Sequence, residues 1–88
     1  MPQTTEERIK DILVQSLCLD ATEITPNSSL REDLGADSLD MVELALCLEE
    51  AFSIAPFTDA EGDSMKTFGD VVRVTEKKIA EREKAVVA

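Results

Sequence analysis

The sequence contains no histidine. Histidine is the usual general base beside a nucleophilic serine or cysteine and the commonest zinc ligand. Its absence removes the Ser-His-Asp and Cys-His arrangements and most zinc sites. A chain of 88 residues is also short for an enclosed enzymatic cleft. We therefore expect that the chain is not an enzyme, has no catalytic residues and holds no metal.

Aromatic residues and cysteines are scarce. Trp and Tyr are absent and there are three Phe, so a core drawn from a 43% hydrophobic composition must be mainly aliphatic. The two cysteines, Cys18 and Cys47, fall in expected helices and share no close motif. We expect both to be small buried side chains of a reduced protein rather than a metal pair.

Basic residues are missing from the middle of the chain. Residues 32–65 contain ten Asp and Glu and no Lys or Arg, whereas the remaining residues balance, so this window supplies the whole net charge of −10. Such a field repels nucleic acid and anionic membranes and attracts proteins with basic patches. The alternative is that the acids only form a solvated face that keeps the protein soluble.

Long apolar runs are also missing. No run reaches the length of a membrane span, and the first residues lack a signal-peptide core. We expect a monomeric cytoplasmic protein with no stable membrane insertion. The length predicts a single domain over residues 1–88, ordered from about 4 to 80, with a tail that frays from Arg82.

Two helix starts can be read before residue 40. Thr4 and Glu7 have capping-box spacing and predict a helix over about residues 5–18. Residues 20–33 then predict a long ordered loop, pinned to the core by Ile24 and Leu30. After Gly35, which tolerates positive φ, Asp37 is a good N-cap.

Ser38 therefore stands in the first turn of a helix expected over residues 38–52. The positive end of the helix dipole favours a negatively charged substituent at such a position. A phosphate ester on Ser38 would fit that field, although Asp37 and Asp40 would oppose it.

Helical spacing separates two apolar stripes on residues 38–52. The larger stripe is the candidate core face. The smaller one is interleaved with acids, which resist burial, and an exposed apolar strip with a charged rim has the form of a docking site. The alternative is that this helix is central and buries both stripes. The larger stripe comprises Met41, Leu44, Ala45, Leu48 and Phe52, and the smaller one comprises Leu39, Val42 and Leu46.

The rest of the chain predicts a short helical turn and a last helix. Pro56 breaks the preceding helix, and residues 58–65 have room for one turn weakened by Gly62. Alternating acids there suggest a calcium loop, but the twelve-residue ligand pattern and its final Glu are missing. Thr67 and Asp70 have capping-box spacing before a helix whose apolar face holds Phe68, Val71, Val72 and Ile79.

The sequence resembles the acyl carrier proteins of dissociated fatty acid and polyketide synthesis over about residues 4–80. The match rests on Asp-Leu-Gly-Ala-Asp-Ser-Leu-Asp at residues 33–40, continued by Val-Glu-Leu at 42–44 and Leu-Glu-Glu-Ala-Phe at 48–52. The resemblance implies an all-α four-helix bundle with a long first loop and a short, weak third helix. It also implies 4′-phosphopantetheine, transferred from coenzyme A onto Ser38.

The same resemblance implies the partners and their contacts. These would be a phosphopantetheinyl transferase and ketosynthase, reductase, dehydratase and acyltransferase enzymes with basic patches. The matching partner-binding positions are Asp37, Leu39, Asp40, Val42, Glu43, Leu46, Glu49 and Glu50. An acyl pocket inside the bundle would be lined by Leu48, Ile54, Met65 and Phe68.

Residues 53–66 depart from the family pattern, with Ser53 where an acid is common and Phe57 after Pro56. A specialised carrier would explain that departure. The competing hypothesis is an acidic helical adaptor that is never modified and uses residues 38–52 to dock basic protein surfaces.

Overall fold

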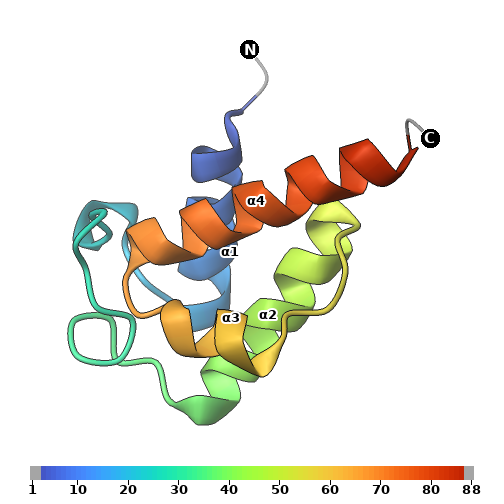
Figure 1. Ribbon diagram of the computed structural model, residues 1–88. Coiled ribbons are helices and arrows are strands. Elements are labelled where there is room, and N and C mark those ends of the chain that lie inside the picture. The colour runs from blue at the N-terminus through green and yellow to red at the C-terminus, as the bar shows by residue number, and fades with distance from the viewer. Residues whose placement is uncertain (1–2, 87–88) are drawn as a thin grey trace.

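The computed structural model describes residues 3–86, which form four α-helices and one short 3₁₀ helix (Figure 1). In chain order these are α1 (Thr5–Leu17), η1 (Ala21–Glu23), α2 (Ser38–Phe52), α3 (Asp59–Ser64) and α4 (Phe68–Val86). The extended pairing recorded within this range is a single bridge between Ser29 and Thr67. The prediction of an all-α bundle with a long first loop and a short third helix is confirmed.

Each α-helix begins with a capping box. A Thr or Asp side chain accepts the backbone N–H three residues later, and an acid at that later position accepts the N–H of the cap. This satisfies two of the backbone donors that a helix start leaves unpaired. The third box was missed from the sequence, although its spacing was readable. The pairs are Thr4 with Glu7, Asp37 with Asp40, Thr58 with Glu61, and Thr67 with Asp70.

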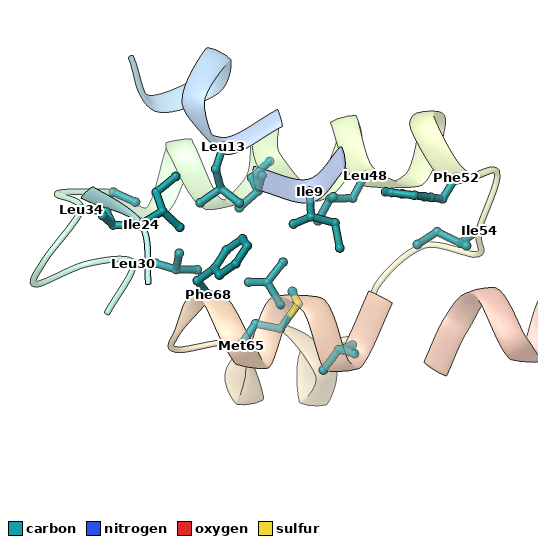
Figure 2. Packing of buried hydrophobic residues seen from close by; sticks show 14 residues of the cluster. Ile9, Leu13, Ile24, Leu30, Leu34, Leu48, Phe52, Ile54, Met65 and Phe68 are labelled. Atoms are coloured by element: carbon teal, nitrogen blue, oxygen red, sulfur yellow. The ribbon is translucent and has the colours of Figure 1, made fainter. Parts of the chain in front are cut away.

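The core lies between the inner faces of α1, α2 and α4 (Figure 2). The larger stripe of α2 points inward as predicted, with Met41 and Ala45 only half-buried at its edge. Aliphatic side chains dominate, and Phe68 lies in the middle of the cluster (Figure 2). The buried apolar residues of the three helices are Ile9, Leu13, Leu44, Leu48, Phe52, Phe68, Val71 and Val74.

The long loop between α1 and α2 is held against the start of α4. Ile24 and Leu30 are buried, as predicted. The Leu30 N–H donates to the Lys66 carbonyl at 2.9 Å, and the Gly69 N–H donates to the Pro26 carbonyl at 2.9 Å. A Cβ on Gly69 would lie 2.9 Å from that same carbonyl oxygen, so only glycine allows this approach. The loop is therefore an ordered part of the fold.

The end of α2 is tied to both neighbouring helices. Arg8 of α1 donates to the Ala51 carbonyl at 3.1 Å and stacks 4.5 Å from the centroid of the Phe52 ring. Arg82 of α4 donates to the Phe52 carbonyl. These arginines satisfy carbonyls that the helix end leaves free. The helical structure continues past Arg82 to Val86, beyond the ordered range of 4–80 expected from the sequence.

The prediction that both cysteines are buried is wrong, because Cys18 and Cys47 are both exposed free thiols. Cys18 caps the end of α1 in the left-handed conformation, with φ of 54°, where the chain turns away from the helix. Cys47 precedes the buried Leu48, and one residue along a helix rotates a side chain by about 100° away from the core direction. Small apolar character alone could not place them.

Candidate functional site

Ser38 lies at the first position of α2 and is exposed. The turn before it is fixed by Gly35, whose φ is 73°, and by the Ala36 N–H, which donates to the Leu30 carbonyl at 2.8 Å. Leu34 and Ala36 are buried on either side of that glycine. The hydroxyl of Ser38 is therefore presented to solvent from a rigid support.

The two acids beside Ser38 are engaged in capping the helix. Asp37 accepts the Asp40 N–H at 2.9 Å, and Asp40 accepts the Asp37 N–H at 3.1 Å. Their carboxylates are thus directed at backbone donors. They still place negative charge next to the hydroxyl, as the sequence indicated.

One cation reaches the Ser38 hydroxyl. Arg31 Nη2 donates to Ser38 Oγ at 3.4 Å, and the guanidinium comes from the loop seven residues earlier. Arg31 is not among the site residues predicted from the sequence. Arg31 immediately precedes the acidic window, and the turn at Gly35 folds the loop back toward the start of α2. That combination was the available signal.

The smaller stripe of α2 is exposed, as predicted. Leu39, Val42 and Leu46 are 66%, 57% and 56% exposed, and they are the large apolar side chains that are exposed within residues 3–84. All three come from one helix face that begins beside Ser38. The alternative in which α2 buries both stripes is therefore excluded.

The acids around this strip differ in what they contact. Glu43 and Glu50 are exposed, and their carboxylates make no hydrogen bond or ion pair in the described part of the chain. Glu49 is half-buried, and its Oε2 accepts the Phe57 N–H at 3.2 Å. Asp37 and Asp40 cap α2. Of the predicted partner-binding acids, two are thus free and three are also engaged within the fold.

A groove of about 840 Å³ lies beside the strip, between α2, α3 and the loop before α2. Its α2 wall is formed by Met41, Val42 and Ala45. Of the four predicted acyl-pocket residues, Met65 lines this groove. The others, Leu48, Ile54 and Phe68, are buried in the core with it (Figure 2).

The other wall of the groove is α3 with Phe57, and a buried lysine of α4 holds it. Lys78 is 6% exposed, and its Nζ donates to Glu61 Oε1 at 2.9 Å and to the Pro56 carbonyl at 3.2 Å. The same ammonium lies 5.1 Å from the centroid of the Phe57 ring. Lys78 was missed, although it follows Val71 and Val74 at helical spacing.

Glu61 is held ionised by its surroundings. The Thr58 N–H and then Lys78 lower the pKa of Glu61 below its usual value, and together they outweigh the opposing effect of burial. Burial raises the pKa of Asp70 in α4. The Thr67 N–H, Arg73 and the Lys66 N–H lower this pKa, and together they outweigh burial, so the pKa of Asp70 is also below its usual value. Both acids are therefore ionised, and as carboxylates they stabilise the first turns of α3 and α4.

Residues 3–86 contain neither a metal-binding cluster nor a membrane-spanning helix. No group of three or more Cys, Asp or Glu side chains is arranged there to hold a metal ion, and Glu61 of the alternating acids faces Lys78 instead. No helix in this range is long and apolar enough to cross a membrane.

The chain is similar to known proteins over most of its length. Residues 7–74 match the protein family described as "Phosphopantetheine attachment site". A protein of Clostridium acetobutylicum named "Acyl carrier protein" is 52% identical over 66 residues, which cover 75% of this chain and 84% of that protein. A Helicobacter hepaticus protein of the same name is 49% identical over 72 residues, covering 82% and 93% of the two chains.

Proposed function

The chain belongs to the acyl carrier protein family, and we propose that Ser38 is the residue to which its 4′-phosphopantetheine arm is attached. The protein is a carrier and not an enzyme, and its arm is a covalent cofactor derived from coenzyme A. When bound, this group supplies the thiol that holds an acyl chain as a thioester. The exposed hydroxyl at the start of α2 is the observation that carries the assignment to Ser38.

The residues around Ser38 fit the arm. The hydroxyl is open to an approaching enzyme, the rigid turn at Gly35 keeps its position constant, and Arg31 offers a positive charge beside it. Transfer forms a bond from Ser38 Oγ to the pantetheine-bearing phosphorus of coenzyme A and breaks the pyrophosphate P–O bond, so that adenosine 3′,5′-bisphosphate leaves. The hydroxyl proton passes to a base of the transferase.

The exposed apolar strip of α2 is the proposed docking surface for the enzymes that attach the arm and act on its acyl chain. Fatty acid synthesis enzymes are the partners that family membership implies. An apolar centre of Leu39, Val42 and Leu46 between Glu43 and Glu50 suits a brief contact with a basic patch, since charges accelerate encounter. The proposed partners are the transferase and the ketosynthase, reductase, dehydratase and acyltransferase classes, met by a monomer in the cytoplasm.

The groove between α2 and α3 is the proposed entrance to an acyl-binding site. Met65 is shared by the groove and the core, so an acyl chain entering there would reach Leu48, Ile54 and Phe68 by displacing core contacts. These three residues are already packed, so the site would form only when a chain enters. Protection of a bound acyl chain from water would be the benefit.

Mass spectrometry tests the attachment site directly. After incubation of the purified protein with coenzyme A and a broad-specificity transferase, the intact mass should rise by one phosphopantetheine. Ser38→Ala should abolish the rise, whereas Ser64→Ala, which removes another exposed hydroxyl, should not. A wild-type protein that gains no mass, or a gain that survives Ser38→Ala, would overturn the assignment.

Partner binding and acyl transfer, measured on the same variant, separate the carrier from an unmodified adaptor. An adaptor would bind basic partners equally well before and after Ser38→Ala, and it would lose binding on Glu43→Lys. A carrier requires Ser38 for acyl transfer by the same partners. The site motif match over residues 7–74 favours the carrier.

A further inference from the structure

Arg31 stands out by its charge and its place. It is the cation recorded in contact with Ser38, at the edge of a segment from 32 to 65 that has ten acids and no base. Its guanidinium forms no ion pair with an acid within residues 3–86. Its recorded polar contact is instead with the neutral hydroxyl of Ser38, at 3.4 Å. A cation that leaves neighbouring carboxylates unpaired and touches a hydroxyl is available for another anion.

The chemistry of the arm supplies such an anion at this atom. The proposal that follows rests on the function proposed above. Once Ser38 carries phosphopantetheine, Oγ becomes an ester oxygen and its proton is gone. The negative charge then lies on the two non-bridging oxygens of the same phosphorus, two bonds from Oγ. A guanidinium that already donates to Oγ reaches these oxygens by rotation of its own side chain.

Arginine suits this anion better than a point charge does. Its planar fork of N–H donors matches two oxygens on one phosphorus, and charge-assisted bonds of this kind are about twice as strong as neutral ones. The side chain also offsets the two carboxylates of Asp37 and Asp40, which otherwise repel a phosphodiester at Ser38. The loop that carries Arg31 is fixed by the Leu30 bond to Lys66, so the guanidinium has a stable base.

A second cation lies on the same side of the groove. Arg31 and Lys66 both line it, and the backbone bond from Leu30 to Lys66 places the two residues next to each other across the loop. Three acids line the groove: Asp59 and Asp63 belong to α3 on the other wall, and Glu32 follows Arg31 on the loop. The loop edge of the groove thus carries two cations against the single carboxylate of Glu32, which forms no ion pair with Arg31, whereas both charges on the α3 wall are negative.

We propose that Arg31 binds the phosphodiester of the arm on Ser38 and so directs the start of the arm along the loop edge of the groove. Arg31 is a positioning residue, because it acts on the attached group and takes no part in the chemistry of the thiol. Lys66 supports it as a more distant positive charge. The anion recognised is a phosphodiester monoanion joined to Ser38, not free phosphate.

Phosphorus and arginine NMR of the fully modified protein test this. In the wild type, the ³¹P resonance of the native protein should differ from that of the same protein unfolded in urea, and the Arg31 Nε–Hε resonance should move on modification. Arg31→Gln should abolish the native-state ³¹P difference, and Arg31→Lys should keep only part of it. Arg73→Gln is the matched control, since it removes an exposed arginine of α4 that pairs with Asp70.

The outcomes are separate from those that test the proposed function. Modification is first driven to completion and confirmed by intact mass for every variant. A wild type that cannot be modified refutes the assignment of Ser38 and with it this proposal. If the wild type is modified at Ser38 but Arg31→Gln leaves the ³¹P resonance unchanged, or Arg31 Nε–Hε does not move, the role of Arg31 is refuted and the carrier function stands.

Discussion

On the outer face of α2, three apolar side chains are more than half exposed and Glu43 beside them has no polar partner within residues 3–86. At the joint between α3 and α4, Lys78 is almost wholly buried and its ammonium contacts Glu61, the Pro56 carbonyl and the Phe57 ring. Both regions combine acids with apolar groups. One leaves its groups free for other molecules, and the other uses them to hold a short helix in place.

The difference lies in what each acid faces. A carboxylate that accepts several donors inside the fold stabilises the fold, and an exposed one mainly contributes to the field around the protein. Glu49 has both surroundings, because it is on the partner-facing helix but accepts the Phe57 N–H. Changing acids of α2 therefore tests docking cleanly only at Glu43 and Glu50.

The largest expected effect is on the free energy of unfolding, at the contact between Lys78 of α4 and the α3 region. Lys78→Met keeps the length of the side chain but removes the ammonium donor from the Pro56 carbonyl and from Glu61, which keeps only the Thr58 N–H. We expect a loss of about 2 kcal/mol in the free energy of unfolding, measured by urea denaturation. Lys77→Met, at an exposed neighbouring position, should change it by less than about 0.5 kcal/mol. Equal effects of the two variants would contradict the importance of the buried contacts.

On the exposed face, function should change while stability does not. Val42→Ser removes apolar surface without a large change in helix propensity. We expect kcat/KM of the transferase for the protein to fall about tenfold, equivalent to about 1.4 kcal/mol. The free energy of unfolding should stay within about 0.5 kcal/mol of the wild type. Ala80→Ser, at an exposed position of α4, is the control and should leave kcat/KM of the transferase unchanged.

A buried hydroxyl one turn before Lys78 sharpens the contrast. Thr75 is fully buried, and its Oγ1 has no hydrogen-bond partner within the described residues. Thr75→Val removes this unsatisfied group at nearly constant shape and should raise the free energy of unfolding by about 1 kcal/mol. Thr22→Val, at an exposed position, should not stabilise. A destabilised Thr75→Val protein would show that the hydroxyl has a partner in solution.

The smallest expected effect depends on pH. The pKa of Glu61 is lowered in the folded protein, so its ionised form adds stability that is complete above the unfolded pKa, about 4.3, and is lost as the pH falls through the folded value. The free energy of unfolding of the wild type should therefore be higher than that of Glu61→Gln, by less than about 1 kcal/mol at pH 7. This difference should shrink below about pH 4. Urea denaturation at a series of pH values measures it. A difference that does not depend on pH would contradict the role of the charge.

Local sequence patterns predicted the helices well because capping and periodicity act over a few residues. Asp37 and Thr67 marked helix starts correctly, and the two stripes of α2 followed from a spacing of 100° per residue. Cys47 was misplaced because a small apolar residue one step from a buried one has no periodic signal of its own. Lys78 was missed because charge argued for exposure.

For the site, Ser38 and its apolar strip were readable from the chain alone, since hydroxyl, cap and stripe all lie on one helix. Arg31, Glu49 and Lys78 were not readable in their roles, because each contact joins segments separated by loops. The sequence by itself determined which helices form and which face of α2 is apolar. Only the tertiary structure decided which charges face solvent and which face each other, because that depends on how α3 and the long loop fold back.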